Sequence, residues 1–224
     1  SIMFAHSPRK FLEYDDLKCE TRESGRKYIT PIGRAYPSVT TVLSILSEEG
    51  IKKWRDRIGH READKISKRA SKRGTAVHEI IEKYLDNTPD YASGYLPHVI
   101  QSLHDIKIEL KNINEIYLQE CALYSDHLGL AGRVDCIGKY DSELSVIDFK
   151  TSRKPKKKEW ISSYFMQCAA YAIMWEERTG IPITKLVILI AVDNAKPQVF
   201  VEHRDNWTRK LIQTIGDYNE RTHI

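Results

Sequence analysis

The sequence contains few cysteines, and their spacing excludes the common metal-cluster motifs. Its 224 residues include four, Cys19, Cys121, Cys136 and Cys168, which lie far apart and form no Cys-x-x-Cys pair. This spacing does not match a zinc site or a four-cysteine iron-sulfur site, and it favours a reducing environment of the cytosolic type. We therefore expect no iron-sulfur cluster.

Long hydrophobic runs are also missing. The longest uninterrupted apolar run has seven residues, Leu186 to Val192, whereas a membrane helix needs about 20. The first residues, SIMFAHSPRKF, lack the apolar region of a secretory signal. These features predict a soluble intracellular protein that does not bind a membrane.

Charge of one sign is not in large excess over the whole chain. There are 35 Lys and Arg against 31 Asp and Glu, a formal net charge of +4, so the overall charge does not by itself indicate a nucleic-acid partner. The basic residues are concentrated locally. Between Lys52 and Arg73 there are ten of them against three acids. Such a run is either a solvated helix face or a surface for phosphates.

Hydrophobic periodicity and turn residues predict an α/β (α+β) fold with a mixed sheet. Residues 1–37 are expected to form an N-terminal arm with a small β hairpin, and residues 38–224 a single domain. Within that domain we expect a helical clamp at about 47–112, a core at about 113–204 and a terminal helix at 205–221. The expected core strands are 116–124, 130–140, 143–150, 185–193 and 198–203, with a long helix at 158–179 between the third and fourth.

The most informative stretch is GLAGRVDCIGKYDSELSVIDFKTS, residues 129–152. Two β-branched, apolar runs flank Asp141 and Ser142, a pattern typical of a β-hairpin with a two-residue turn. Counting outward from that turn places Asp135 opposite Asp148, at a Cβ separation of about 5 Å. Lys150 shares a face with Asp148 because strand side chains alternate with period two. Two acids and one amine are therefore expected at one point of the sheet.

These residue types suit metal-assisted phosphodiester chemistry. Two carboxylates can share a Mg²⁺ ion, which also accepts water and phosphate oxygens as ligands. The ammonium of Lys150 can orient the attacking water or neutralise charge. The alternative is a solvated hairpin face with an Asp-Lys ion pair, and an isolated Asp-x-Lys does not distinguish the two.

Neighbouring helices contribute further candidates. His78 shares a face with Glu82 on a helix that continues the basic run, as either an ordinary structural histidine or a ligand. On the long helix, Gln167 interrupts an aromatic stripe and requires a polar partner. Ser38 either caps a short helix or contacts phosphate. The basic loop RKPKKK, residues 153–158, is either a flexible charged loop or part of a path for a single strand whose bases stack on aromatic rings.

Four motifs in this order resemble the RecB-type branch of the PD-(D/E)XK nuclease superfamily. They are GTAVH at 74–78, GRVD at 132–135, IDFKT at 147–151 and QCAAY at 167–171. The segment YPSVTTVL at 36–43 also fits the branch that includes phage exonucleases and the mitochondrial exonucleases. The resemblance covers most of the chain. It implies a restriction-endonuclease-like core with a mixed central sheet flanked by helices, preceded by an N-terminal helical insertion.

The resemblance also implies roles for individual residues. It implies that His78, Asp135, Asp148 and the Phe149 backbone carbonyl bind Mg²⁺ or Mn²⁺, with Glu120 as a further ligand or a neighbour of the ligands. Lys150 would be the catalytic lysine, supported by Gln167 and Tyr171. The residues expected to contact nucleic acid are Ser38, Arg69, Arg73, Thr151, Ser152, Lys154, Trp160 and Tyr164.

The expected function is therefore that of a metal-dependent DNA exonuclease. It would hydrolyse phosphodiester bonds in single-stranded DNA or at DNA ends during replication, repair or recombination, alone or with replication or recombination proteins. The alternatives are a structure-specific endonuclease or junction resolvase, and a catalytically silent nucleic-acid-binding module. The resemblance implies the cytoplasm of a bacterial or phage-infected cell, with the mitochondrial matrix as the alternative.

Overall fold

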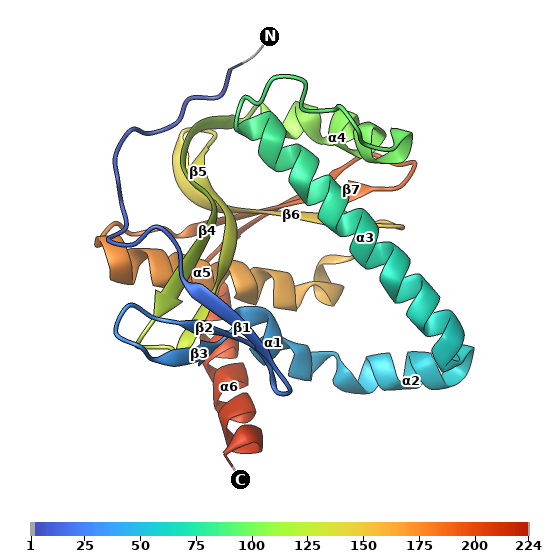
Figure 1. Cartoon of the computed structure of the whole chain (residues 1–224), viewed down its shortest axis with the longest axis vertical. Helices are drawn as coiled ribbons and strands as arrows, with labels where there is room; N and C mark the ends of the chain where they lie inside the picture. Colours follow the sequence, from blue (N-terminus) through green and yellow to red (C-terminus); the bar gives the residue numbers. More distant parts are fainter. Residues whose placement is uncertain (1–2, 224) are drawn as a thin grey trace.

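A five-stranded mixed sheet forms the centre of the protein. In the computed structural model, which describes residues 3–223, the strands lie in the order β4-β5-β6-β7-β8 (Figure 1). The β6–β7 pair is parallel and the other pairs are antiparallel. The strands are β4 Ile113–Ser125, β5 Leu130–Tyr140, β6 Glu143–Ser152, β7 Lys185–Val192 and β8 Gln198–His203. The predicted mixed sheet is confirmed. Residues 1 and 2 of the expected arm, and residue 224, lie outside the described residues.

The hairpin of β5 and β6 has the predicted register. Tyr140 pairs with Glu143, and the ladder continues outward to the pair of Cys136 and Ile147. The two turn residues between the strands have φ values of 49° and 69°, as in the type I′ turns whose twist matches that of hairpin strands. The ladder ends there, one residue before Asp135 and Asp148, and the carboxyl groups of these two residues still lie close enough to interact.

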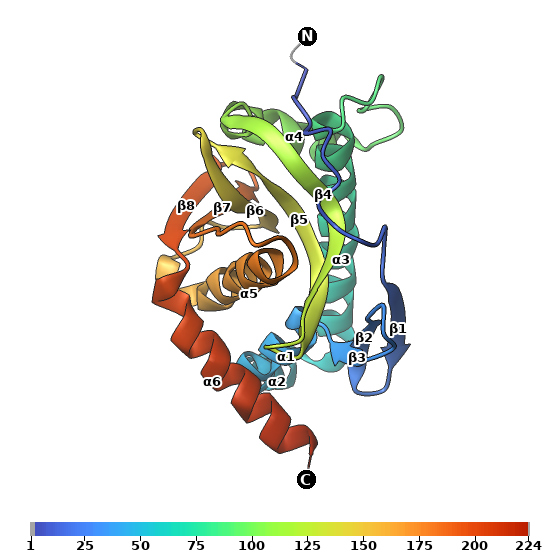
Figure 2. The same ribbon diagram turned by 90° about the vertical axis from the view of Figure 1, so that its left-hand side faces the viewer.

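Helices cover both faces of this sheet. Helix α5 (Ser162–Thr179) lies on one face with α1 (Val39–Leu43) and α6 (Asp205–Thr222), and α3 (His60–Leu85) and α4 (Pro97–Leu110) cover the other (Figure 2). Fully buried side chains such as Trp175 and Phe165 of α5 fill the first layer. Each large apolar side chain buried in this way contributes about 1.5–3 kcal/mol. Because α5 connects β6 to β7, it packs back against these two strands on one face of the sheet.

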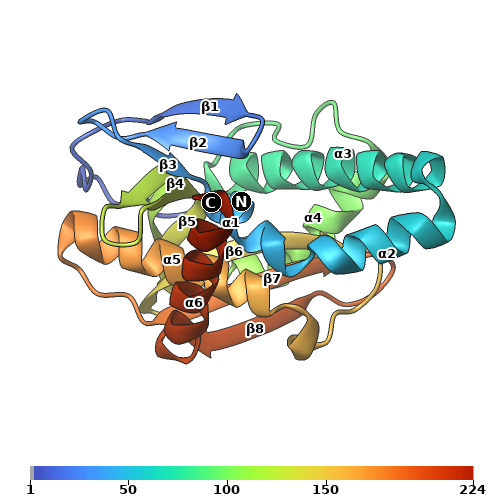
Figure 3. The ribbon, with the colours of Figure 1, turned by 90° about the horizontal axis from the view of Figure 1, so that it is seen from below.

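Helices α2 (Glu48–Ile58) and α3 meet at a sharp corner. Gly59 lies between them with φ 90° and ψ 148°, a backbone region that is essentially restricted to glycine. None of the α2 residues is buried, and Ala63 is the single buried residue of α3 before Val77. These two segments therefore project as a helical hairpin (Figure 3), whereas the rest of α3 and α4 belong to the core. The expected helical clamp thus combines a projecting part with a part that packs on the sheet.

The loop between α3 and α4 is held by aromatic contacts. The sequence suggests a lid or linker here, but Tyr91 lies edge-on to Tyr84, with ring centroids 5.0 Å apart. The ammonium group of Lys107 donates a 2.7 Å hydrogen bond to the Tyr91 hydroxyl, and Lys83 lies over the ring of Tyr95. The loop is therefore packed against the helices that it connects.

The N-terminal part forms a second, smaller sheet. It contains β1 (Lys18–Arg22), β2 (Gly25–Ile29) and β3 (Ala35–Pro37). The sequence predicted the β1–β2 hairpin but not β3. Before it, the chain runs along β4, where His6 bridges to Ile116 and the backbone of Phe4 exchanges two hydrogen bonds with the Asn87 side chain. Among the helices of residues 3–223, none combines the length and the hydrophobicity that a membrane span requires.

Candidate active site

A histidine and three acids converge where α3 meets the curved part of the sheet. One ligand atom each from His78, Glu120 and Asp135 lies within 4.8 Å of the others. The His78 Nδ1 atom is 3.6 Å from Asp135 Oδ1. Asp148, on the neighbouring strand, lies close enough to Asp135 to raise its pKa. The four side chains that the sequence singled out as metal ligands are thus brought together, and we refer to them as the acid centre.

Asp135 and Asp148 are buried, His78 and Glu120 are half-buried, and the ionisation of the acid centre reflects this. Burial raises the pKa of Asp135 well above its ordinary value, and the nearby Asp148 raises it further. Burial, assisted by Glu82, raises the pKa of Glu120 to about 7. Burial also lowers the pKa of His78, which favours the neutral imidazole that metals bind. The carboxylates therefore repel one another in a poorly solvated place, and a cation would relieve that repulsion.

One buried oxygen in this centre lacks a hydrogen-bond donor. Asp148 Oδ2 is fully shielded and accepts no hydrogen bond. Lys150 Nζ lies 3.0 Å away as an ion-pair contact, but without hydrogen-bond geometry. A buried acceptor without a donor is costly, and carboxylate oxygens with one neutral imidazole are a ligand set that suits Mg²⁺ or Mn²⁺. The residues present therefore fit a divalent cation.

The Phe149 backbone belongs to the same centre. Its N–H donates to Asp135 Oδ2 at 2.9 Å, which fixes the orientation of that carboxylate. Its carbonyl interacts with the His78 ring as a hydrogen-bond acceptor, and this interaction partly offsets the fall in the pKa of the histidine. The carbonyl that was predicted as a further metal ligand thus lies beside the side-chain ligands.

Lys150 is held by a chain of polar contacts from α5. Its Nζ donates to Gln167 Oε1 at 2.8 Å, and Gln167 Nε2 donates to the Tyr171 hydroxyl at 3.3 Å. The ring of Tyr164 lies 4.9 Å from the same ammonium group, within the range of a cation–π interaction. Burial alone would lower the pKa of Lys150, but Asp148 and Asp135 outweigh it and raise the pKa above its ordinary value. Lys150 is therefore a fixed cation.

Sequence reasoning did not identify Gly132 as part of this arrangement. A Cβ at this position would lie 2.9 Å from Tyr171 Cε1 and 3.0 Å from the Tyr171 hydroxyl, closer than side chains pack. The glycine of the GRVD motif thus leaves room for the tyrosine that ends the chain of contacts to Lys150. The sequence feature that could have identified Gly132 is its position in the GRVD motif, three residues before Asp135.

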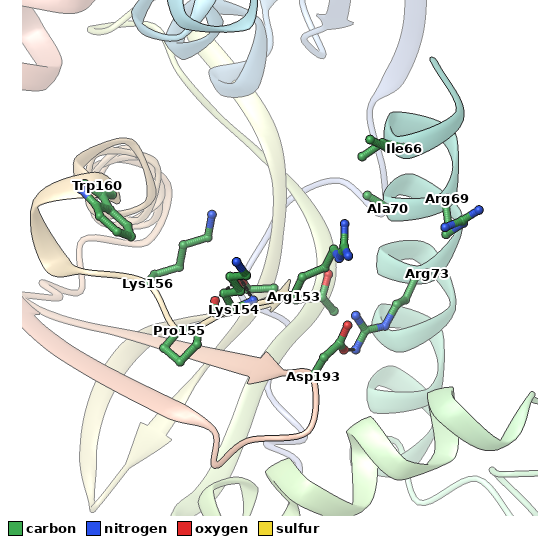
Figure 4. Close-up of a pocket in the computed structure, with 12 residues that line it drawn as sticks. Ile66, Arg69, Ala70, Arg73, Arg153, Lys154, Pro155, Lys156, Trp160 and Asp193 are labelled. Carbon is green, nitrogen blue, oxygen red and sulfur yellow. Dashed lines mark hydrogen bonds and ion pairs between the residues drawn. The ribbon is translucent and has the colours of Figure 1, made fainter. Parts of the chain in front are cut away.

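A cavity of about 680 Å³ lies between α3 and the loop that follows β6, and its lining includes Thr151, the residue after Lys150. Figure 4 shows the basic side chains of the loop facing α3 across this space, with Trp160 at its far side. We call it the basic cavity. Six of the eight residues predicted to contact nucleic acid line it. They are Arg69, Arg73, Thr151, Ser152, Lys154 and Trp160.

The other two predicted contact residues lie elsewhere. Tyr164 lies against Lys150, as described above. Ser38 is buried, and its Oγ accepts a 3.1 Å hydrogen bond from the Thr41 backbone N–H, so the structure supports its role as a helix cap. Contact between Ser38 and nucleic acid has no support from this geometry.

Asp193 also lines the basic cavity, although the sequence analysis gave it no role. It forms an ion pair with Arg73 (Figure 4). It follows the carboxyl end of β7, directly beside the end of β6 in the parallel pair. Functional residues gather at the carboxyl ends of parallel strands, so the predicted succession of strand 143–150, helix 158–179 and strand 185–193 contained a signal for this residue.

Curated relatives of this sequence share one name. Mitochondrial genome maintenance exonuclease 1 of Xenopus tropicalis is 34% identical over 114 residues, which is 49% of this chain and 30% of the relative. The protein of the same name from Homo sapiens is 29% identical over 211 residues, 83% of this chain and 58% of the relative. The chain therefore spans less than two thirds of the length of these relatives. A solved structure from Eubacterium rectale, provisionally named an exonuclease, aligns with a TM-score of 0.47 and 14% identity over 66% of this chain and 65% of that chain.

The family comparison covers the site as well as most of the fold. The sequence model of the PD-(D/E)XK nuclease superfamily matches residues 52–220. That range begins in α2 and ends in α6, and it includes the acid centre, Lys150 and the helix that supports it. By this match, the chain belongs to the PD-(D/E)XK nuclease superfamily.

Proposed function

We propose that this protein is a DNA exonuclease that depends on Mg²⁺ or Mn²⁺ and hydrolyses phosphodiester bonds in single strands or at DNA ends. The observation that carries the proposal is the buried acid centre with a fixed lysine beside a basic cavity. The names of the curated relatives support exonuclease activity in genome maintenance. They also favour a mitochondrial location over a bacterial or phage-infected cytoplasm.

The side chains divide the chemical work between binding and charge stabilisation. His78, Asp135, Asp148 and the Phe149 carbonyl would hold the cation, with Glu120 as a further ligand or as a base near them. The bound cation would supply Lewis-acid stabilisation of the phosphate and a more acidic water. Lys150 stays protonated because of its acidic neighbours, so it acts as a donor that neutralises charge on the phosphate and orients the attacking water.

The basic cavity is suited to a single strand. Arg69 and Lys154 supply charge for phosphates, whereas Ile66 and Ala70 give the α3 side apolar surface. The Trp160 side of the cavity is open, since this residue is 63% exposed, and bases stack well on such a ring, with about 1–3 kcal/mol per base. A duplex hides its bases, so this arrangement favours unpaired DNA. We infer that the projecting α2–α3 hairpin forms an arch that admits such a strand.

A time course on end-labelled single-stranded DNA tests the proposal. Wild-type protein in Mg²⁺ should release label from the 5′ or the 3′ end, and EDTA should abolish release. Lys150→Ala should lower the rate by at least about 100-fold, whereas Lys139→Ala, on the outer part of β5, should not change it. If the wild type binds DNA but shows no turnover in Mg²⁺ or Mn²⁺, the protein is a binding module.

A second substrate distinguishes the exonuclease from an endonuclease or junction resolvase, which would use the same acid centre. Covalently closed circular single strands have no ends. An exonuclease that works from ends through an arch should leave them intact while it digests the same sequence in linear form. Cleavage of the circle at a comparable rate would contradict both the arch and the exonuclease assignment.

A further inference from the structure

A second cavity lies on the other side of α3. It has a volume of about 630 Å³ and is bounded by α3, α4 and the carboxyl end of β7. We call it the α4-side cavity. Its volume falls within the range of about 300–1,000 Å³ that is typical of small-molecule sites. The acid centre does not open into it, because Lys150 and Asp148 lie against α5 residues, whereas Phe149 and Ile147 pack with α3 and α4.

The two cavities are separated by the side chain of Arg73, which lines both. Its guanidinium group is held from two sides. Nη2 donates to Ser102 Oγ of α4 at 3.2 Å, and the group forms an ion pair with Asp193. The Nε atom is fully buried and has no hydrogen-bond partner. A buried donor without an acceptor is costly, so Ser102 and Asp193 do not satisfy the whole guanidinium group in this arrangement.

The walls of the α4-side cavity differ in chemistry. The α3 wall carries the positive charges of Arg69 and Lys72. The α4 wall presents the apolar side chains of Leu96, which is 63% exposed, and Val99. The amide of Gln101 and the carboxylates of Asp105 and Asp193 also line the cavity, and Gln101 Nε2 donates a 2.8 Å hydrogen bond to Asp105. A ligand with an anionic end, an apolar flat part and hydrogen-bonding edges matches these walls, and a nucleotide has all three.

We propose that the α4-side cavity binds a nucleoside monophosphate, the product expected from the neighbouring active site. This inference rests on the proposed nuclease function. The phosphate lies against Arg69, Lys72 and Arg73 and replaces Asp193 as the partner of the Arg73 guanidinium. The base lies against Leu96. The proposed site is thus separate from the acid centre, and the Arg73 side chain lies between it and the basic cavity.

The test is equilibrium binding of deoxyadenosine 5′-monophosphate to the full chain by titration calorimetry in EDTA, where no hydrolysis occurs. Wild-type protein should bind the nucleotide at one saturable site. Lys72→Glu, which changes a residue of this cavity alone, should weaken binding at least about tenfold. Lys68→Glu is the matched control, since it lies one helical turn earlier on the same exposed side of α3 and should leave the affinity within about twofold.

Two further arms identify the part of the ligand that is recognised. Deoxyadenosine and inorganic phosphate should each bind at least about tenfold more weakly than the nucleotide. Leu96→Asn should weaken binding of the nucleotide and leave binding of phosphate unchanged. Unfolding midpoints of Leu96→Asn and Lys72→Glu within about 2 °C of the wild type show that both variants fold. Equal affinity of phosphate and nucleotide, or equal affinity of Lys72→Glu and Lys68→Glu, would overturn the proposal.

Failure of this inference and failure of the nuclease assignment can be distinguished. Lys150→Ala removes the proposed catalysis but does not touch this cavity, so the variant should bind the nucleotide with wild-type affinity. A wild-type protein that digests DNA but does not bind the nucleotide would overturn this inference and leave the proposed function intact. Nucleotide binding by a protein without nuclease activity would overturn the proposed function and leave the α4-side cavity as a nucleotide site.

Discussion

Asp135 is the residue at which the requirements of function and of stability oppose each other most directly. Its carboxyl group is buried beside Asp148, and both features raise its pKa, which means that the ionised form costs free energy in the folded protein. The same charge is what would attract a divalent cation. Without a cation, the acid centre should therefore lower the stability of the fold.

Replacement of Asp135 by Asn should raise the unfolding midpoint of the metal-free protein. Removal of a buried charge that repels its neighbours should contribute about 1 kcal/mol, or about 2–4 °C for a chain of this length. Mg²⁺ or Mn²⁺ should stabilise the wild type by about 2–3 kcal/mol at a 100-fold excess over its dissociation constant, and this gain should disappear in D135N. Calorimetric melting with EDTA and with each cation measures both effects.

The control for this prediction is an exposed acid away from the centre. Asp56→Asn, on the outer surface of α2, should leave both the metal-free midpoint and the cation effect close to the wild-type values. A lower midpoint for D135N in EDTA would mean that the Asp135 charge does not destabilise the fold. An undiminished cation effect in D135N would mean that Asp135 is not a metal ligand.

Gly132 should affect catalysis through the tyrosine that it contacts. An alanine at this position would force Tyr171 away from its place and loosen the Gln167 contact to Lys150. We expect kcat to fall about 10- to 100-fold, since misplacement of a catalytic group by about 1 Å costs that much, with little change in KM or in the cation-dependent stabilisation. Steady-state kinetics on a single-stranded oligonucleotide measures kcat and KM separately.

Two variants make the Gly132 prediction specific. Combining Gly132→Ala with Tyr171→Ala should cost no more than Tyr171→Ala alone, because the two residues act through one contact. Gly216→Ala, where the added Cβ meets no atom within 4 Å, should retain full activity. If the two losses add independently, Gly132 acts by another route.

At the scale of the elements, the turn between β5 and β6 offers room for stabilisation. Ser142 has a φ of 69°, a region that costs a non-glycine residue about 1–2 kcal/mol. Ser142→Gly should therefore raise the free energy of unfolding by about 0.5–1 kcal/mol after the added flexibility of the unfolded chain is counted. Ser71→Gly, in the exposed part of α3, should lower it by a similar amount. Denaturant titration measures the free energy of unfolding of both variants. A lower value for S142G than for the wild type would contradict the strain argument.

The elements themselves were largely predictable from local sequence. Alternating residues around a two-residue turn defined the hairpin register, and the apolar period of α5 placed Gln167 and Tyr171 on one side of the helix. Contacts between distant segments were not predictable in the same way. The pairing of His6 with Ile116, the Arg73–Asp193 ion pair and the closeness of Gly132 to Tyr171 all depend on how the elements pack, and no local pattern records that.

The whole molecule separates its charges in space. The chain carries a formal net charge of only +4, yet the projecting α2–α3 hairpin and the loop after β6 are strongly basic, while the acid centre lies beside them. Binding of single-stranded DNA should therefore release counterions locally and weaken steeply as salt increases.

This prediction can be checked by fluorescence titration of an oligonucleotide in EDTA at several salt concentrations. Arg69→Ala should reduce the slope of log K against log salt by about 0.7, the value for one phosphate contact on a single strand. Lys139→Ala is the control, because Lys139 lies near the β5–β6 turn, and it should leave the slope unchanged. An unchanged slope for Arg69→Ala would place the strand away from the basic cavity.

The two pairings of β6 also differ in the distance along the chain that they must close. β5 and β6 meet through a two-residue turn, whereas β6 meets β7 only after α5 has been traversed. Short loops close faster than long ones during folding. The facing aspartates therefore belong to the earlier pairing, and the contact from Gln167 to Lys150 belongs to the later one. During folding, Asp135 and Asp148 should therefore come together and be able to attract a cation before Gln167 fixes the position of Lys150.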